Sequence, residues 1–460
     1  MTTTRLDAPD LLNATLVLVA GGHPLTGRVR VQGSKNIALH LHAAALTADT
    51  GTVLENCPDI LDTGVCAGIL EYTGSTVTVD GGRFTVTPAD HPTPVVHPVL
   101  GRRVRTTVVL AAALLARTGQ VSFPQPGGDA FCPRLIDRHL AAMQAAGADI
   151  TSADSIYRAS FPSGAVRAFT TDVNTPYGPS LGATVTAMLL AARAEGTSLI
   201  THPSIEPEVT ETARFLQLGG TGIGWDQDGL HVTGTSHLAG SSFTVAGDRI
   251  EAGTMLMAMA ATHGSIGLDG ISCDALPGGL RDALAGAGVT VAPDGQQGLT
   301  AAAGALDAVE AATGPHPGLP TDTAPQLAAM LTQACGTSLI HERIYPRRDT
   351  HIAALAAFGA DISACGSTVR VTGPATLRAA DTEAADIRAV TSLLIAALAA
   401  DGTSTIRGMY HLRRGYSQLL AKLATLGAHV TTIQEPSHGS TRAVYQRRPG
   451  RPSRDLAPAR

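Results

Sequence analysis

An internal repeat constrains the fold of this chain more than any other feature. An Ala/Leu-rich helical stretch ends at a glycine, and a short β-rich run follows, as in LARTGQVSFP and LAARAEGTSLITH. The pattern recurs six times along the chain, at Gly51, Gly119, Gly196, Gly264, Gly336 and Gly402. A second helical stretch follows each copy and stops at another glycine 23 to 28 residues on, as expected where glycine ends a helix. Self-similarity at a steady period indicates a repeat architecture.

Six such units, each of about 70 residues with two helices and several strands, predict an α/β (α+β) protein. Units of this length exceed those of the common solenoid arrays, so we expect three units in each of two similar domains. The first domain would cover 35–246, and the second would combine 15–34 with 247–436. The remaining stretch, 437–460, is rich in Pro and Arg, which predicts a disordered basic tail with no assigned partner.

Composition excludes several classes of protein. The 460 residues are 44% hydrophobic, which is enough for sizeable cores. A net charge of −5 and an aromatic content of 3% argue against nucleic-acid binding. The six cysteines are scattered without a CxxC pair, so we expect neither a metal knuckle nor a disulfide framework. The first ten residues lack a basic signal region, and the apolar stretch 11–20 is too short to span a membrane. These features predict a cytoplasmic protein.

Cations stand where helices ordinarily disfavour them. A base at a helix N-terminus costs roughly 0.3–1 kcal/mol, yet five lie at or just before predicted helix starts: Lys35, Arg105, Arg134, Arg388 and Arg414. One such case would be ordinary surface variation. Five suggest a bound anion that receives both the helix dipoles and the side-chain charge. The ligand would carry several negative groups, such as phosphate and carboxylate, and no Walker A or GxGxxG motif points to a nucleotide hydrolase or dinucleotide enzyme.

Acidic residues near such a site could move protons. Asp129 lies in the glycine-rich stretch PGGDAFCPR, Asp322 lies just before a predicted helix, and Asp248 lies in GDRIEAGT. For Asp248 and Asp322, a helix cap or a turn residue is the simpler alternative.

Several segments together resemble the enolpyruvyl transferase family over about residues 20–434. They include GSKNIALHLHAAAL, GGDAFCPRLIDRH, SLGATVTAMLLAARAEGT, GDRIEAGT, PHPGLPTDTAPQ and YHLRRGYSQLLAKLATLGA. The match is closest to the branch that acts on UDP-N-acetylglucosamine. The resemblance implies a two-domain inside-out α/β barrel with three βαβαββ-type units in each domain. It also implies transfer of the enolpyruvyl group of phosphoenolpyruvate to a hydroxyl of a uridine nucleotide, with release of phosphate and without a cofactor or metal.

The resemblance assigns roles to residues of this chain. Lys35, Arg134 and Arg414 would hold phosphoenolpyruvate or the departing phosphate, and Asn36 would position the intermediate. Asp129 and Asp322 are the candidate proton-transfer groups, with the step that each performs left open. Asp386 and Arg388 match a conformationally coupled pair. The expected contacts to the acceptor nucleotide are Arg105, Arg134, Leu135, Ile136, Asp137, Arg138, Gly178, Pro179, Ser180, Leu181 and Ile344.

Four positions depart from the family pattern. Asp129 stands where many members carry a cysteine; a carboxylic acid of raised pKa can still donate a proton. It is a poorer nucleophile toward an epoxide, which predicts insensitivity to fosfomycin. Cys132, three residues on, is the alternative stand-in for that cysteine, although a buried structural cysteine is the simpler expectation. Gly178 replaces a lysine that contacts the diphosphate, while Pro346 and Leu135 replace a glutamate and a proline.

These departures leave the acceptor open. One reading is the 3-hydroxyl of UDP-N-acetylglucosamine, in the synthesis of peptidoglycan precursors for the cell wall. Another is the 3′-hydroxyl of UMP, the acceptor of similar transferases in nucleoside-antibiotic pathways, because an acceptor with one phosphate would not need the lost lysine. A shikimate 3-phosphate acceptor fits the motifs less well. A non-catalytic paralogue that only binds a uridine nucleotide is the remaining alternative, although it would not need all of the site cations.

Overall fold

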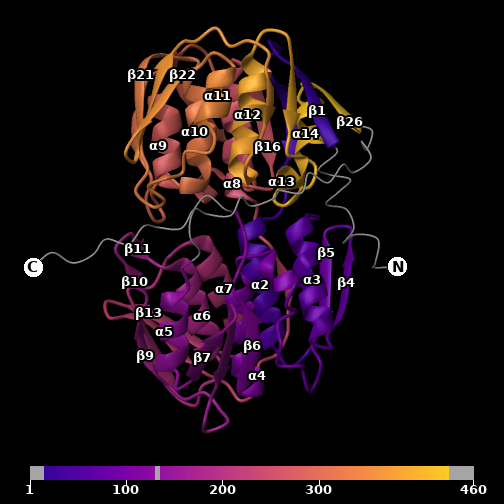
Figure 1. The fold of residues 1–460 in the computed structure, drawn as a ribbon, viewed down its shortest axis with the longest axis vertical. Helices are drawn as coiled ribbons and strands as arrows, with labels where there is room; N and C mark the ends of the chain where they lie inside the picture. The colour runs from indigo at the N-terminus through magenta and orange to yellow at the C-terminus, as the bar shows by residue number, and fades with distance from the viewer. Residues whose placement is uncertain (1–14, 130–134, 435–460) are drawn as a thin grey trace, which may run out of the picture.

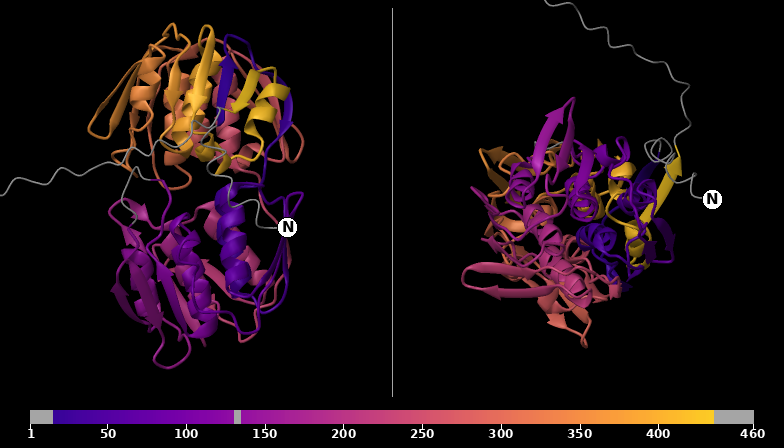
Figure 2. Two further views of the ribbon diagram at one scale, coloured as in Figure 1. Left: turned by 45° about the vertical axis from the view of Figure 1, so that its right-hand side comes forward. Right: turned by 90° about the horizontal axis from the view of Figure 1, so that it is seen from below.

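The computed structural model describes residues 15–129 and 135–434, which form two stacked lobes (Figure 1). We call residues 35–244 the N-terminal lobe, and residues 15–30 together with 249–434 the C-terminal lobe. A turned view shows the same two bodies (Figure 2). Among the described helices, none combines the length and the apolar character that crossing a bilayer requires.

The described part of the N-terminal lobe contains six α-helices, and its elements run through three successive units. The helices are α2 (Lys35–Thr47), α3 (Leu61–Tyr72), α4 (Thr107–Thr118), α5 (Asp137–Ala145), α6 (Leu181–Ala191) and α7 (Pro207–Leu218). The strands are β3 (Thr52–Glu55), β4 (Thr76–Asp80), β5 (Arg83–Thr87), β6 (Gln120–Pro124), β7 (Asp149–Ala153), β8 (Ile156–Ser160), β9 (Thr170–Asp172), β10 (Asn174–Thr175), β11 (Gly178–Pro179), β12 (Thr197–Thr201), β13 (Gly222–Asp226), β14 (Gly229–Thr233) and β15 (Ser242–Thr244).

The C-terminal lobe repeats this arrangement and takes its first two strands from the start of the chain. Its helices are α8 (Arg249–Ala261), α9 (Gly278–Gly286), α10 (Ala324–Leu331), α11 (Ile352–Ala357), α12 (Ile387–Ala399), α13 (Met409–Arg413) and α14 (Leu419–Thr425). Its strands are β1 (Thr15–Ala20), β2 (Thr26–Arg30), β16 (Ser265–Asp269), β17 (Val289–Pro293), β18 (Gly298–Ala303), β19 (Leu306–Asp307), β20 (Glu310–Ala312), β21 (Ala334–His341), β22 (Asp361–Cys365), β23 (Thr368–Gly373), β24 (Asp381–Glu383), β25 (Thr403–Arg407) and β26 (His429–Gln434).

The main sheets share one topology, which explains the sequence repeat. Each has a parallel pair followed by two antiparallel strands, in the orders β15-β3-β5-β4, β9-β12-β14-β13, β2-β16-β18-β17, β20-β21-β23-β22 and β24-β25-β1-β26. The sixth, β6-β8-β7, has a parallel bridge between Val95 and Ser122 in place of the outer strand. The mixed α/β class expected from the sequence is therefore confirmed.

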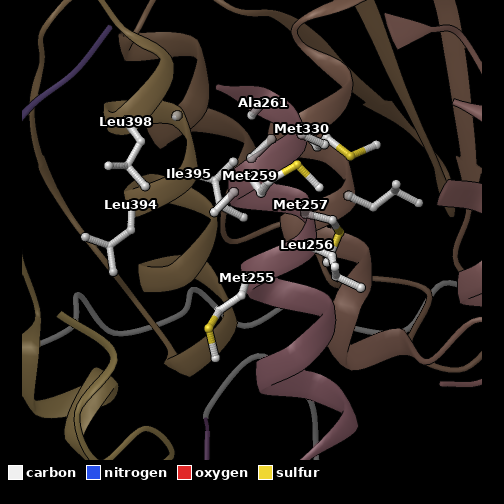
Figure 3. Packing of buried hydrophobic residues seen from close by; sticks show 14 of the residues in the cluster. Met255, Leu256, Met257, Met259, Ala261, Met330, Leu394, Ile395 and Leu398 are labelled. Atoms are coloured by element: carbon white, nitrogen blue, oxygen red, sulfur yellow. The ribbon is translucent and has the colours of Figure 1, made fainter. Parts of the chain in front are cut away.

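Helices fill the inside of each lobe. In the N-terminal lobe α2, α4 and α6 pack against one another, and α8, α10 and α12 do so in the C-terminal lobe. Every residue of α8 is buried, and from Met255 to Ala261 the helix is apolar on all sides, as expected for a helix inside the core. Figure 3 shows Met257 and Met259 of α8 near Met330 of α10, with Ile395 of α12 beside them. The buried hydrophobic side chains form two clusters, one from residues 37–245 and one from 17–31 with 252–428.

The chain crosses between the lobes twice, and the two crossings pair with each other. The amide of Ser34 donates to the carbonyl of Ala246 at 2.7 Å, and the amide of Asp248 donates to that of Gln32 at 2.8 Å. Gly33 lies between them, and a Cβ placed on it would sit 1.7 Å from the carbonyl oxygen of Asn56. This close backbone approach requires glycine.

We expect Gly33→Ala to destabilise the protein strongly, because neither backbone segment can move away without breaking the crossing. Loss of soluble protein, or a lower urea midpoint, would show it. Gly64→Ala is the matched control, since Gly64 lies inside α3 with no atom within 4 Å of its missing Cβ. That change should be neutral or stabilising by about 0.5–1 kcal/mol. Equal unfolding midpoints for the two variants would contradict the packing argument.

A histidine buried in α2 makes stability depend on pH. His42 stacks on Phe84 with ring centroids 4.1 Å apart and lies 3.5 Å from the thiol sulfur of Cys57. Burial lowers the pKa of His42 to about 3. The unfolded chain binds a proton at this residue below about pH 6.5, while the folded chain does not, so stability falls as the pH is lowered.

We expect the wild type to lose about 2 kcal/mol more than His42→Leu between pH 7 and pH 5, at 1.36 kcal/mol per pH unit below the unfolded pKa. Urea unfolding at the two pH values measures the difference. Parallel losses in the two proteins would show that His42 is not the group responsible.

Candidate active site

A cleft between the lobes holds two adjoining spaces. The outer cavity has a volume of about 700 Å³, and the inner pocket has one of about 40 Å³. Asn36, Arg105, Asp322 and Tyr345 border both. The inner pocket is further lined by Lys35, Leu39, Asp62, Gly128, Asp129, Arg348, Ile387, Arg388 and Arg414.

Helix starts deliver several of these residues to the cleft. Lys35 is the first residue of α2, which Ser34 caps, and its own amide donates to Asp248 at 3.1 Å. Asp248 in turn caps α8 by accepting from the amides of Ile250 and Glu251. The helix-cap alternative for Asp248 is therefore confirmed. Arg388 occupies the first turn of α12.

A buried carboxylate, Asp62, organises the cations of the inner pocket. It accepts from Lys35 Nζ at 2.8 Å and from Arg414 Nε at 3.1 Å. Arg414 also forms an ion pair with Asp129. Because Asp62 and Asp129 belong to the N-terminal lobe and Arg414 to the C-terminal lobe, these pairs join the lobes. Burial opposes the charged form of this guanidinium, but Asp62 and Asp129 outweigh burial and raise its pKa, so the group stays charged.

Lys35 is positioned to respond to a bound anion. Burial lowers the pKa of its ammonium group, Asp62 opposes this effect, and the charges of Arg414 and Arg388 add to the lowering. A bound anion would reverse part of this repulsion and favour the charged form of the lysine.

Asp322 carries a negative charge that is shared by two arginines. Its carboxylate lies 2.9 Å from Arg348 and 2.6 Å from Arg388. Burial alone would raise its pKa, but Arg388, Arg348 and Arg105 outweigh burial and hold the pKa well below the usual range. The group is therefore ionised at neutral pH, and the same three cations make it a weak base in the unliganded site. Its backbone lies in a short 3-10 turn before α10. Asp322 is therefore a turn residue, as the simpler alternative expected, and it also lines the site.

A second buried ion network borders the outer cavity. Arg249 of α8 pairs with Glu206 at 2.8 Å and with Glu208 of α7 at 3.1 Å. The amide of His316 donates to Glu206 at 3.0 Å. Since Arg249 and His316 belong to the C-terminal lobe, this network also links the two lobes. Sequence reasoning did not single it out.

The cleft gathers most of the residues that the sequence singled out. Lys35, Asn36, Arg105, Asp129, Asp322, Arg388 and Arg414 line the inner pocket, and Leu135, Ile136, Gly178, Pro179, Ser180, Leu181 and Ile344 line the outer cavity. Asp137, Arg138 and Asp386 line neither. Asp386 instead caps α12, accepting from the amide of Arg388 at 2.7 Å, and receives the hydroxyl of Thr350. Arg134 and Cys132 lie outside the described residues.

One expectation about helix starts is wrong. Arg414 does not open a helix: it is the C-cap of α13, and the next helix, α14, begins only at Leu419. A cation at a helix C-terminus is favourable. Arg105 precedes the start of α4 by two residues, with Thr106 as the cap. The anion-binding argument thus rests at Arg414 on its side-chain charge and not on a helix dipole.

Sequence reasoning missed Asp62, a residue that is only 4% exposed. It lies in the first turn of α3, where acids are common for helix stability alone. The signal available was an acid inside the otherwise apolar run ILDTGVC.

We expect Asp62→Ala to lower the free energy of unfolding by about 3–5 kcal/mol, because it leaves two buried cations side by side without their shared carboxylate. Urea unfolding without substrates measures this. Glu71→Ala on the same helix, where the side chain is exposed, should change stability by less than about 0.5 kcal/mol. Equal effects would mean that Asp62 does not hold the cluster together.

Comparison with known proteins identifies the family. A family model for EPSP synthase (3-phosphoshikimate 1-carboxyvinyltransferase) matches residues 19–423. The chain belongs to this enolpyruvyl transferase family. The UDP-N-acetylglucosamine 1-carboxyvinyltransferase of Prosthecochloris aestuarii is 37% identical over 416 residues, which cover 90% of this chain and 97% of the relative. That of Hyphomonas neptunium is 37% identical over 421 residues, covering 90% and 97%.

Solved structures agree with the family assignment. The enolpyruvyl transferase NikO from Streptomyces tendae superposes with a TM-score of 0.84 at 28% identity, covering 92% of this chain and 99% of NikO. The EPSP synthase of Acinetobacter baumannii reaches 0.70 at 16% identity, covering 91% and 100%, and shows the shared fold alone. This enolpyruvyl transferase is thus an enzyme whose candidate site lies between the lobes.

Proposed function

We propose that this enzyme transfers the enolpyruvyl group of phosphoenolpyruvate to a hydroxyl of a uridine nucleotide and releases phosphate. The 3-hydroxyl of UDP-N-acetylglucosamine is the first acceptor to consider, in the cytoplasmic synthesis of a peptidoglycan precursor. The relatives at 37% identity carry that name. No cofactor is required by this chemistry.

The charge of the inner pocket carries the proposal. Five cations line it against three carboxylates, Asp62, Asp129 and Asp322. The excess positive charge in a buried space suits a small ligand with several negative groups. Phosphoenolpyruvate supplies a phosphate and a carboxylate, and Asn36 and Asp322 at the border with the outer cavity would face the acceptor hydroxyl.

The carboxylates can divide the proton transfers. Phosphoenolpyruvate at Arg414 would compete with Asp129 for that guanidinium, and the added negative charge would favour the protonated form of Asp129. Asp129 would then protonate the methylene carbon, while ionised Asp322 accepts the proton of the attacking hydroxyl. Loss of phosphate and return of a methyl proton to Asp129 restore the double bond as an enolpyruvyl ether.

We further propose that the two lobes are the two domains, 35–246 and 15–34 with 247–436, each a helix-centred inside-out α/β barrel. The separate hydrophobic clusters and the repeated sheet topology support this. The ion pairs of Arg414 and Arg249 would hold the domains closed over the substrates and exclude water.

A second acceptor, the 3′-hydroxyl of UMP, is favoured by one observation. Gly178 has φ +103°, and a Cβ placed on it would lie 2.8 Å from Pro315 Cγ of the other lobe. A lysine at this position would therefore be strained and would collide with Pro315. UMP has one phosphate where UDP-N-acetylglucosamine has two, so UMP needs fewer positively charged contacts at this position.

Phosphate release tests the proposal. The purified protein is mixed with phosphoenolpyruvate and either UDP-N-acetylglucosamine or UMP in separate reactions. Release with the sugar nucleotide alone would support the peptidoglycan reading, and release with UMP alone would support nucleoside-antibiotic synthesis. No release with either, together with tight nucleotide binding, would favour the non-catalytic paralogue and contradict the proposal.

A further inference from the structure

Almost every cation that borders the cleft is already paired with a carboxylate. Arg249 pairs with two glutamates, Arg348 and Arg388 share Asp322, and Lys35 and Arg414 share Asp62. Within residues 15–129 and 135–434, two lining arginines form no ion pair: Arg105, between the two spaces, and Arg347, on the outer cavity. Unpaired guanidinium groups on a cavity wall are the natural contacts for a ligand's anionic groups.

The backbone that carries Arg347 is held firmly. The amide of Arg348 donates to the carbonyl of Tyr345 at 2.9 Å, so Pro346 and Arg347 form the middle of a β-turn, with proline at the position that turns favour. The buried carboxylate of Glu342 accepts from the amides of Ile344 and Tyr345 at 2.8 and 2.9 Å.

The same carboxylate is fixed from the other side. Glu342 accepts the hydroxyls of Thr313 and Thr321, each at 2.7 Å. Arg348 donates to Thr321 at 2.9 Å and pairs with Asp322. The turn is therefore preorganised, and the exposed Arg347 side chain projects from a fixed base at the cavity.

The β10–β11 hairpin, on the wall of the outer cavity opposite Arg347, supplies no cation. The β10–β11 hairpin brings Thr175, Tyr177 and Gly178 to this wall, and none of them carries a charge. Pro315 occupies the space into which a side chain at 178 would extend. Among the described residues, the unpaired arginines left for an anionic group of the acceptor are therefore Arg105, at the border with the inner pocket, and Arg347 of the C-terminal lobe.

We propose that Arg347 binds the 5′-phosphate of the acceptor nucleotide and is a specificity-determining residue of this enzyme. The positive charge for this phosphate is then supplied by a turn of the C-terminal lobe and not by the hairpin of the N-terminal lobe, so acceptor binding depends on lobe closure. This inference rests on the proposed uridine-nucleotide acceptor.

Arg347→Ala and Arg347→Lys test it, with Arg343→Ala as the matched control. Arg343 is exposed on the same loop but borders neither space. Calorimetry measures binding of uridine, UMP and UDP without turnover, and steady-state kinetics measures KM for phosphoenolpyruvate and for the acceptor.

We expect Arg347→Ala to weaken UMP and UDP about 10- to 100-fold, as for a lost charge-assisted hydrogen bond. Uridine binding and the KM for phosphoenolpyruvate should change less than about twofold, Arg347→Lys should recover part of the affinity, and Arg343→Ala should match the wild type. Equal losses for uridine and UMP, a raised KM for phosphoenolpyruvate alone, or failure of the wild type to bind any uridine nucleotide would overturn the inference. Nucleotide binding that depends on Arg347 without phosphate release would support it while contradicting the proposed reaction.

Discussion

Replacing Lys35 by alanine is expected to lower kcat/KM for phosphoenolpyruvate by about 10²–10³-fold, the usual effect of losing one charge that is aimed at the reacting groups. The ammonium group lies in the inner pocket, 2.8 Å from Asp62 and beside Arg414. Uridine-nucleotide binding should persist, because Lys35 does not border the outer cavity. Steady-state kinetics and calorimetry on the same preparation separate the two effects.

Lys35→Met is the matched variant, since it keeps most of the apolar stem and removes only the charge. It should lose turnover as severely as the alanine variant. Recovery of activity in the methionine variant would assign the role of Lys35 to packing. Loss of nucleotide binding with unchanged turnover at saturating substrate would place the phosphoenolpyruvate site elsewhere.

Fosfomycin should leave the wild type active and should inactivate Asp129→Cys. A carboxylate is a weak nucleophile toward an epoxide, whereas a thiolate is a strong one. Asp129 forms an ion pair with Arg414, so a cysteine in its place would have a neighbouring cation that favours the thiolate. Activity after incubation with the inhibitor, followed by mass spectrometry of the modified peptide, measures the outcome.

The wild type contains other cysteines, which provide an internal control. Burial raises the pKa of Cys57 to about 12, and it raises that of Cys66 as well, so neither thiol should react. Rapid covalent inactivation of the wild type with modification at Asp129 would contradict the prediction that this carboxylate does not react with fosfomycin. An Asp129→Cys variant that turns over and resists fosfomycin would do the same.

Much of the fold was predictable because each repeat carries local sequence signals for where its helices and strands begin and end. Glycines such as Gly119, with φ +74°, end helices in a conformation that other residues rarely adopt. Apolar helices and short strands then follow at regular intervals. The return of β1 and β2 to the C-terminal lobe was expected in outline, but their pairing with β16, β25 and β26 depends on contacts between distant residues.

The candidate site was predictable only where charge stood out against its surroundings. Lys35 and Arg388 break the helix-terminus preference and lie in the inner pocket. Asp62 and Glu208 were missed because an acid in the first turn of a helix is ordinary by itself. Their role appears only when the fold brings Arg414 and Arg249 against them from the other lobe.

The acceptor side shows the same limit. The family resemblance drew attention to Gly178 in place of a lysine, but only the structure shows that Pro315, distant in sequence, lies 2.8 Å from where a Cβ at residue 178 would be. Arg347 likewise stands out as a candidate ligand contact only because the structure shows that neighbouring cations such as Arg249 and Arg348 are paired with carboxylates.

Transfer of labelled carbon tests the central claim most directly. Phosphoenolpyruvate labelled in its three-carbon unit is incubated with the enzyme and the nucleotide acceptor, and both the label in the nucleotide and the released phosphate are quantified. We predict one labelled enolpyruvyl group on the nucleotide for each phosphate released, with both formed about 10²–10³-fold more slowly by Lys35→Ala at low phosphoenolpyruvate. If phosphate were released and neither UDP-N-acetylglucosamine nor UMP became labelled, the enzyme would be hydrolysing phosphoenolpyruvate and not transferring its enolpyruvyl group. That result would contradict the account.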